Sequence, residues 1–426
     1  CMTWTALTRI APATSSPAAA ANATDERVTL ADLSQDLPEN AAAMASSPGA
    51  AAVRNAASSD PLIRAAIVLE KGDVVAKYIR EDVEPDTPYQ VWSTTKSWTS
   101  LLVGIMVDNK LLSVDETLGD IFAADSGAWD DVADNETISL REAVTIEEML
   151  TMSSGLISPP DDDGDFEGAL TNGGGASLSD SLAYPDIGDK GNFSYLGMSN
   201  ILSYVVKERT ERTPREYLAE NVMLHLGIAE REYNWLQNED EVEFAFHGLE
   251  LTPLQMVKFG QLYLQGGLSG PTTSDEQHRR LISQSWIDAS FATHSTSTGI
   301  VNAGYGYLFW NLGVWCALGM FGQDICVVPH LERVVVQQRD PDYDNVLLGN
   351  FIVAAVAINP ALSFDAQPEG VGDSYPSATP TKLETNSSIG PSPTKAENSS
   401  SIRPSIGFMA LGTSFIAALS ALAHLC

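Results

Sequence analysis

The sequence predicts an α/β fold of the α+β kind, in which an antiparallel sheet is flanked by helices and interrupted by a helical insertion. Two stretches rich in apolar and β-branched residues, Ala65–Glu70 and Asp73–Tyr78, surround Lys71-Gly72, an arrangement typical of a β-hairpin. Further strand-like stretches follow only from residue 304 on, and apolar residues at helical spacing occupy the region between. Strands from both ends of a domain then join one sheet, and the helices between them form the insertion.

The amino-acid composition indicates a large buried core and argues against several kinds of partner and cofactor. Of the 426 residues, 44% are apolar, which is enough for a large buried core. The net charge of −32, from 56 acidic and 24 basic residues, repels nucleic-acid backbones, so we expect no nucleic-acid partner. The four cysteines form no Cys-x-x-Cys pair, the six histidines are scattered, and the sequence has no glycine-rich phosphate-binding motif. We therefore expect neither a metal site nor a cofactor.

The chain divides into four segments by composition. Residues 1–60 are rich in Ala, Ser and Pro without an apolar period, which predicts disorder. A globular domain is expected over 61–362, with a helical subdomain at about 97–290. Residues 363–405 are dominated by Ser, Thr, Pro and Gly, as in an extended stalk, and residues 406–426 form an almost uncharged apolar segment.

The apolar segment at 406–426 predicts attachment to a membrane. A removable lipid-anchor signal and a C-terminal membrane span both fit a run of this length. We favour the lipid anchor because no basic residues follow the run, with Asn398-Ser399-Ser400 as the candidate attachment site. Because the chain begins with Cys1 and shows no signal peptide, we expect its natural start to lie upstream. Five sequons agree with a secretory route to the cell surface, at Asn22, Asn135, Asn192, Asn386 and Asn398.

Within the domain, caps and periodicity predict where the elements begin and end. A core helix begins near Ser93, because apolar residues recur at helical spacing up to Met106, and Asp108-Asn109-Lys110 ends it. Thr252-Pro253 begins a later helix, which Gly266-Gly267 ends. Other helices are expected at Ile146–Met152, about 197–210, 214–225 and 346–357, and strands at 304–311, 313–319, 324–328 and Arg333–Gln338.

The tetrad Ser93-Thr94-Thr95-Lys96 is the strongest candidate for chemistry. Ser and Lys three apart on a helix project from one face, so Lys96 can reach the Ser93 hydroxyl and take its proton. The free N–H groups at a helix N-terminus also favour developing negative charge. The alternative is that Ser93 only caps the helix. The spacing alone does not decide, because Ser392-Pro393-Thr394-Lys395 repeats it in the Pro/Ser-rich tail.

Five motifs follow one another along the domain, namely Val91–Ser97, Glu148–Leu156, Gly191–Tyr195, Gly248–Leu264 and Gly319–Gln323. In this order they resemble the serine beta-lactamase and penicillin-binding-protein superfamily, in particular its branch of class C beta-lactamases, esterases and 6-aminohexanoate-oligomer hydrolases, over about 61–360. The resemblance implies a beta-lactamase/transpeptidase-like fold and a hydrolase that forms an acyl-enzyme.

The resemblance also implies roles for single residues. Ser93 would be the acylated nucleophile and Lys96 its proton acceptor, which requires that burial or hydrogen bonding lower the pKa of Lys96. Tyr195 would share the proton relay and protonate the leaving group, the alternative being an ordinary buried tyrosine. We expect the oxyanion hole to use the backbone N–H groups of Ser93 and Met320, the latter next to Gly319 on the strand that lines the site.

Two positions depart from the family pattern. The family often has Asn two residues after the tyrosine, where this chain has Gly197, so either Asn200 supplies the amide or that contact is absent. Penicillin-recognising members have Lys-Ser/Thr-Gly on the lining strand, and many esterases have His in place of that Lys. This chain has Ala317-Leu318-Gly319 there, so no cation is available to hold a substrate carboxylate.

Two cysteines flank the last motif. If Gly319–Gly322 turns a hairpin, Cys316 and Cys326 lie on neighbouring strands, where they either form a disulfide or remain as buried free thiols.

Three functions are compatible with these motifs. The first is a serine hydrolase for an ester or amide, the second a peptidase for D-amino-acid or cell-wall peptides, and the third an inactive cell-surface glycoprotein that keeps the fold. The presence of Ser93, Lys96 and Tyr195 together favours an active enzyme, and the missing cation disfavours the peptidase. The expected partner is therefore a small-molecule ester, amide or short peptide; the oligomeric state is left open.

Overall fold

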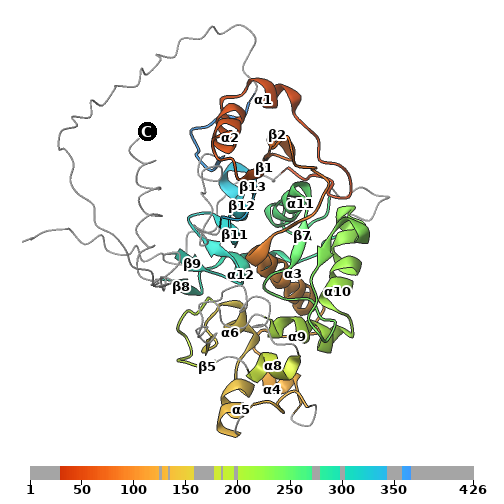
Figure 1. Cartoon of the computed structure of the whole chain (residues 1–426), viewed down its shortest axis with the longest axis vertical. Coiled ribbons are helices and arrows are strands. Elements are labelled where there is room, and N and C mark those ends of the chain that lie inside the picture. Colours follow the sequence, from red (N-terminus) through yellow and green to blue (C-terminus); the bar gives the residue numbers. More distant parts are fainter. Residues whose placement is uncertain are drawn as a thin grey trace, which may run out of the picture.

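The computed structural model describes residues 29–123, 127–132, 135–157, 177–183, 186–195, 200–270, 279–297, 303–342 and 357–365. Its centre is an eight-stranded antiparallel sheet in the order β2-β1-β13-β12-β11-β10-β9-β8 (Figure 1). The strands are β1 (Ile63–Glu70), β2 (Asp73–Ile79), β8 (Ser295–Ser297), β9 (Ala303–Tyr305), β10 (Trp310–Asn311), β11 (Trp315–Gly319), β12 (Gln323–Val328) and β13 (Arg333–Arg339).

The pairing of β1 with β13 joins the two ends of the domain. Ile67 lies opposite Val336 in this pair, and β1 also forms a hairpin with β2. The predicted α+β fold is therefore confirmed, as is the expectation that segments distant in sequence share one sheet.

Two long helices connect the sheet to the region of Ser93. α11 (Pro253–Leu264) packs against β1, β12 and β13, and Gly260 permits the close approach, because a Cβ there would lie 2.4 Å from Cγ1 of Val334. α3 (Thr95–Asp108) packs against α11 through Trp98, which stacks on Phe259 with ring centroids 4.3 Å apart. α11 begins at the predicted cap, where the Thr252 side chain accepts a hydrogen bond from the N–H of Gln255.

The helical insertion lies between β2 and β8. Figure 1 shows α4, α5, α6 and α8 gathered at the end of the molecule opposite α1 and α2. Its helices are α4 (Leu118–Ile121), α5 (Asn135–Glu142), α6 (Ile146–Leu150), α8 (Leu178–Ala183), α9 (Ile201–Thr210), α10 (Pro214–Asn221) and α12 (Gln284–Phe291). Short strands also occur, namely β3 (Tyr89–Gln90), β6 (Asn234–Trp235) and β7 (Leu249–Leu251) in one small sheet, and β4 (Leu156–Ile157) and β5 (Asp186–Ile187) in another.

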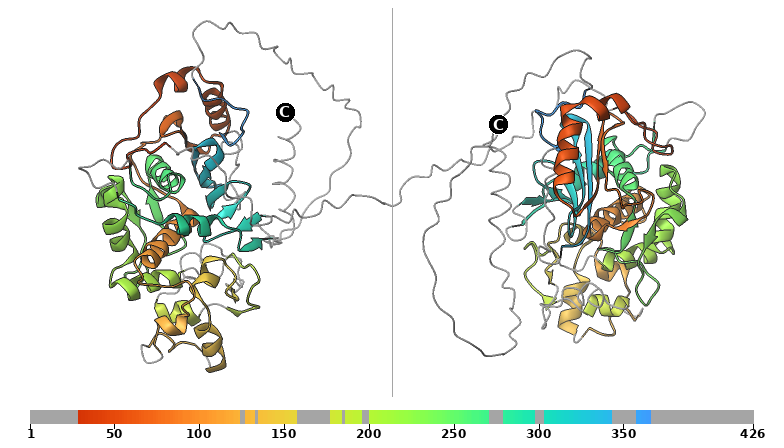
Figure 2. Two further views of the ribbon diagram at one scale, coloured as in Figure 1. Left: turned by 180° about the vertical axis from the view of Figure 1, so that it is seen from behind. Right: turned by 45° about the horizontal axis from the view of Figure 1, so that its top comes forward.

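The N-terminal segment corrects a prediction from the sequence. Residues 1–60 were expected to be disordered, but α1 (Ala41–Ser46) and α2 (Pro48–Ser59) form within them, and α2 packs on β1 and β2 (Figure 2). The prediction was wrong for residues 29–60 because the buried face of α2 consists mainly of small residues, Ala50, Val53 and Ala57. Alanine is the strongest helix former, yet it gives a weak hydrophobic period.

Other boundaries also differ from the prediction. The strand expected at 304–311 is two strands, β9 and β10, which pair with each other. The domain extends past its expected end at 362, because Phe364 is buried and stacks on the guanidinium of Arg333. The helix expected at 346–357, apart from its last residue, and the stalk beyond residue 365 lie outside the described residues, as does the apolar segment at 406–426. Among the residues described, no helix is long and apolar enough to cross a membrane.

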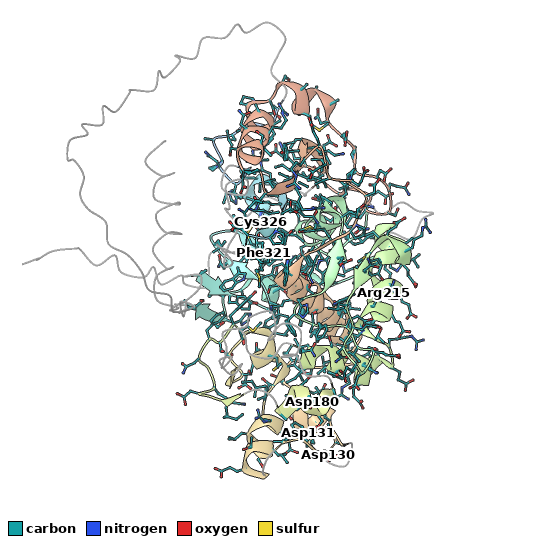
Figure 3. The ribbon with its side chains drawn as sticks, viewed as in Figure 1. Asp130, Asp131, Asp180, Arg215, Phe321 and Cys326 are labelled. Carbon is teal, nitrogen blue, oxygen red and sulfur yellow. A yellow bond between two sulfur atoms is a disulfide. The ribbon has the colours of Figure 1, made fainter. Side chains whose placement is uncertain are left out.

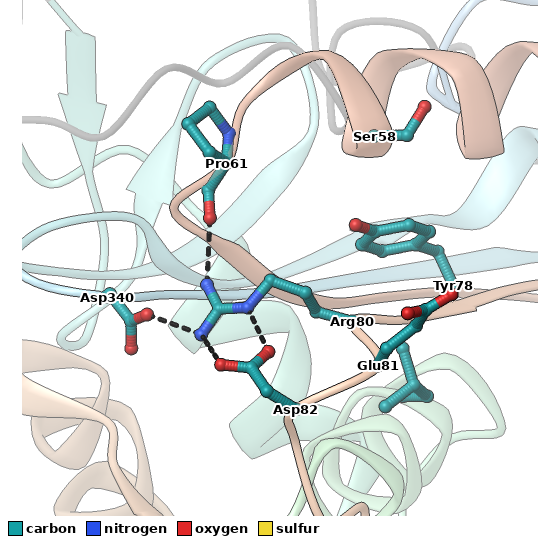
Figure 4. Close-up of a pocket in the computed structure, with 8 residues that line it drawn as sticks. Ser58, Pro61, Tyr78, Arg80, Glu81, Asp82 and Asp340 are labelled. Carbon is teal, nitrogen blue, oxygen red and sulfur yellow. Dashed lines mark hydrogen bonds and ion pairs between the residues drawn. The ribbon is translucent and has the colours of Figure 1, made fainter.

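A surface hollow beside the ends of α2 and β2 is occupied by an ion-pair cluster. The Arg80 guanidinium donates to both carboxylate oxygens of Asp82, to Asp340 at 2.7 Å and to the carbonyl oxygen of Pro61 at 2.9 Å (Figure 4). These contacts join β2, the turn before β1 and the segment after β13. Because Arg80 is engaged by groups of its own chain, the cluster is structural and separate from the residues around Ser93.

Candidate active site

Ser93 lies on a short 3-10 turn, Trp92–Thr94, that continues directly into α3. The N-cap position of α3 belongs to Thr94, and no side chain caps it, so Ser93 does not act as the helix cap. The turn is fixed on two sides: the N–H of Val91 donates to the carbonyl of Leu249 in β7, and the Thr94 hydroxyl donates to the carbonyl of Gln323 in β12. The Ser93 side chain is thereby free of a capping role and presented at the start of a buried helix.

Lys96 contacts the Ser93 hydroxyl directly. Its Nζ lies 2.8 Å from Ser93 Oγ and 3.2 Å from the carbonyl oxygen of Phe246, and the residue is only 4% exposed. Burial lowers the pKa of Lys96 from 10.5 to about 7. A large fraction of Lys96 is therefore uncharged at neutral pH, and in that form the amine can accept the proton of Ser93.

Tyr195 completes a group of three. Its ring centroid lies 4.8 Å from Lys96 Nζ. Burial raises the pKa of Tyr195, while hydrogen bonds to Ser93 and Trp310 act in the opposite direction. Tyr195 is thus a neutral phenol in contact with the Ser93 hydroxyl. The structure brings together the three side chains that the sequence predicted as catalytic.

Gly319 and Met320 lie where the sheet meets the Ser93 turn. Gly319 ends β11, and a Cβ on it would lie 2.3 Å from the carbonyl oxygen of Val91, so only glycine fits. Met320 follows in the turn before β12. The turn that carries Ser93 and the turn that carries Met320 are therefore neighbours, as an oxyanion hole built from their two N–H groups requires. That role of the two N–H groups stays a prediction.

Cys316 and Cys326 form a disulfide across the same hairpin. They lie directly opposite each other in the register of β11 and β12. The sequence left open a disulfide or two buried free thiols, and the structure contains the disulfide. Figure 3 labels Cys326 and Phe321 of this hairpin near the middle of the molecule, away from Asp130, Asp131 and Asp180 of the insertion.

Asn200 contacts the segment that leads to the carbonyl of Phe246. It is fully buried before α9, where its Oδ1 accepts the N–H of Ala245 at 3.1 Å and its Nδ2 lies 3.5 Å from Ser181 Oγ. The chain after Ala245 carries the Phe246 carbonyl that contacts Lys96. These contacts tie Asn200 to the segment that contacts Lys96, while its predicted place in the substrate site stays a prediction; Gly197 lies outside the described residues.

Aromatic residues that the sequence did not single out surround Tyr195. Trp310 lies 5.1 Å from its ring and Tyr305 6.1 Å, and Phe193 contacts both of them. Residues 305–310 contain four aromatic residues, a composition that indicates an aromatic cluster as well as the predicted strand. Burial is the first cause of the lowered pKa of Lys96 and of the raised pKa of Tyr195 and Tyr305, and among the described residues no Lys, Arg, Asp or Glu side chain adds to these shifts. Burial, more than any neighbouring charge, therefore shifts the pKa values of these side chains.

Comparisons with known proteins identify the family to which the chain belongs. The family model described as Beta-lactamase matches residues 39–339. The 6-aminohexanoate-dimer hydrolase of Paenarthrobacter ureafaciens is 21% identical over 294 residues, which cover 65% of this chain and 73% of that protein.

Solved structures share the fold. A penicillin-binding protein homologue from Caulobacter crescentus has a TM-score of 0.56 at 17% identity, over 73% of this chain and 96% of its own. A D-stereospecific amidohydrolase from Streptomyces has a TM-score of 0.55 at 15% identity, over 73% and 99%. Because the family model spans well over half of the sequence and the solved structures share the fold, this chain belongs to the Beta-lactamase family of hydrolases.

Proposed function

We propose that this protein is a serine hydrolase that cleaves uncharged esters or amides through an acyl-enzyme on Ser93. The observation that carries the proposal is the 2.8 Å contact between Lys96 Nζ and Ser93 Oγ, in surroundings that lower the pKa of Lys96 to about 7. A serine becomes an effective nucleophile when an adjacent group takes its proton, and a buried lysine is such a group.

The reaction has two halves. Ser93 Oγ attacks the substrate carbonyl carbon while its proton passes to Lys96, and the N–H groups of Ser93 and Met320 hold the negative oxygen of the tetrahedral intermediate. The bond to the leaving group then breaks, and the proton reaches that group through Tyr195. In the second half, water attacks the acyl-enzyme by the same route, releases the acid and restores Ser93.

The charge of the site favours an uncharged substrate. Ala317 stands where penicillin-recognising relatives have lysine, so a substrate carboxylate at that point would be buried without a counter-ion, which is costly. The net charge of −32 also disfavours the approach of anions. The names of a relative and of a solved structure, 6-aminohexanoate-dimer hydrolase and D-stereospecific amidohydrolase, support hydrolysis as the reaction.

An alkyl fluorophosphonate probe tests the proposal, because it reacts covalently with activated serines. We expect it to label the wild-type protein and the Ser392→Ala variant, which loses the second Ser-x-x-Lys tetrad, but not the Ser93→Ala variant. Absence of labelling in the folded wild-type protein would instead favour the inactive glycoprotein.

A matched pair of esters tests the substrate class. p-Nitrophenyl butyrate and p-nitrophenyl hemisuccinate have acyl chains of equal length, but the second carries a carboxylate at its end. We expect at least tenfold faster hydrolysis of the neutral ester, since about 1.4 kcal/mol of unfavourable burial corresponds to that factor. Equal rates for the two esters would exclude the preference for uncharged substrates.

A further inference from the structure

Thr94, the residue next to Ser93, is held by the β11–β12 hairpin. Its hydroxyl donates to the carbonyl of Gln323 and lies 3.5 Å from the carbonyl oxygen of Ala317. Thr94 is fully buried, and its own N–H donates to the carbonyl of Val91 at 3.1 Å. The place of Ser93 relative to the hairpin therefore depends on where β12 begins.

The side chain of Gln323 fixes that starting point. Its Nε2 donates to the carbonyl of Arg339, and its Oε1 accepts the N–H of Arg339 at 3.3 Å. The register of β12 and β13 ends with Asp324 opposite Gln337, so the Gln323 amide continues the ladder one step beyond it. Because Gln323 is fully buried, water does not compete for these two bonds.

Arg339 is itself anchored from the other side. Its Nε donates to Oδ2 of Asp60 at 2.9 Å, and both side chains are at most 10% exposed. Asp60 is the C-cap residue that follows α2, and Ile63 pairs with Arg339 in the sheet. An unbroken path of contacts thus leads from Asp60 through Arg339 and Gln323 to Thr94.

We propose that Gln323 is a positioning residue, which holds the Thr94 turn so that Ser93 faces Lys96 and the hairpin in the geometry needed for acylation. Its effect on catalysis rests on the proposed function, whereas its physical coupling to the turn does not. An amide is required at this point because it donates to one backbone group of Arg339 and accepts from the other. A carboxylate cannot donate, and a thioether makes neither bond well.

Gln323→Met removes both bonds at nearly constant volume, and Gln265→Met is the matched control. Gln265 is also buried, and its amide likewise bonds the N–H and the carbonyl of a single residue, Ala31 in the N-terminal segment, at 3.1 Å each. Two quantities are measured: amide hydrogen exchange over residues 91–95 and the rate of fluorophosphonate labelling. For Gln323→Met we expect faster exchange there and labelling slower by about 10- to 100-fold. For Gln265→Met we expect neither change.

Gln323→Glu keeps the shape of the side chain but makes its ability to donate a hydrogen bond depend on pH. A pH-dependent labelling rate is a result that a purely structural role of Gln323 would not give. The protonated acid donates as the amide does, whereas the carboxylate does not. The labelling rate of Gln323→Glu relative to wild type is therefore expected to rise as the pH falls from 8 to 6.

Two results overturn the positioning role: unchanged exchange over residues 91–95 in Gln323→Met, or a ratio for Gln323→Glu that does not vary with pH. If the wild-type protein is not labelled, the proposed function fails, and the exchange measurement alone decides the role of Gln323.

Discussion

The indole of Trp92 packs edge-on against the ring of Phe321, with ring centroids 5.4 Å apart. Both residues have positive backbone φ, 50° for Trp92 and 64° for Phe321, a conformation that costs free energy in non-glycine residues. They directly flank the two predicted oxyanion donors, because Trp92 precedes Ser93 and Phe321 follows Met320. The contact therefore fixes the two strained turns against each other at the point where the two N–H groups must converge.

A double-mutant cycle of Trp92→Ala and Phe321→Ala measures this contact. We expect a coupling free energy of about 0.5–1.5 kcal/mol in urea unfolding, as for other edge-on aromatic pairs. Each single variant should also be labelled more slowly by fluorophosphonate, because the turns are then free to move apart. Trp129→Ala is the control: it truncates a buried tryptophan of the insertion, so it should lower stability without slowing the labelling of folded protein.

The lowered pKa of Lys96 predicts how the rate of fluorophosphonate labelling depends on pH. The uncharged form of Lys96 is the base and its pKa is about 7, so the labelling rate should rise between pH 6 and pH 8 and then level off. Lys96→Arg should lower the rate by about 10²- to 10⁴-fold at every pH, because arginine stays charged. A wild-type profile with its midpoint near pH 10 would contradict the burial of a neutral amine at this position.

The same group also changes the free energy of unfolding. Lys96 has a pKa of about 7 in the folded chain and 10.5 as the ordinary value, so between these pH values unfolding takes up a proton. Stability should therefore rise with pH across this window, by up to about 1.4 kcal/mol per pH unit from this group. Lys96→Met removes the contribution, and urea unfolding at pH 7.5 and pH 9 should show a smaller increase in the variant than in wild type.

The sequence predicted the parts of the site that depend on local spacing. Ser93 and Lys96 are three residues apart on one helix face, and the cap at Thr252 and the hairpin around Gly319–Gly322 are likewise local patterns. The carbonyl of Phe246 was missed, because it lies 150 residues from Lys96 and is a backbone group that no residue type reveals. α2 was missed for another reason: its buried face is mostly alanine, whose contribution to the core depends on how closely it approaches β1 and β2.

The raised pKa of Asp324 predicts that stability changes with pH in the direction opposite to the effect of Lys96. Asp324 is buried in β12, and burial raises its pKa well above 3.8, although a backbone contact at Gly319 and the charge of Arg339 oppose the shift. Above pH 4 the unfolded carboxyl is ionised while the folded one keeps its proton, so stability is lost as the pH rises through this range. Asp324→Asn should therefore gain stability relative to wild type between pH 5 and pH 8, measured by urea unfolding.

Asp60→Asn is the matched control for Asp324→Asn. It removes the carboxylate that pairs with the buried Arg339, which should destabilise the protein by about 3–5 kcal/mol. A loss for Asp324→Asn that grows from pH 5 to pH 8 would mean that the Asp324 carboxylate is ionised in the folded protein, contrary to the prediction.

The disulfide between Cys316 and Cys326 should stabilise the hairpin that carries Gly319 and Met320. The bridge closes a loop with a sequence separation of 10, and a short loop of this kind contributes about 2–4 kcal/mol by restricting the unfolded chain. We expect the variant with both Cys316→Ser and Cys326→Ser to lose that amount in urea unfolding. Treatment of the wild-type protein with a reductant should reproduce the loss and leave the double variant unchanged. Fluorophosphonate labelling of the folded fraction should slow in both cases, because β11 then holds Met320 less firmly against the Ser93 turn. An unchanged labelling rate would show that the β11–β12 backbone pairing alone maintains the site.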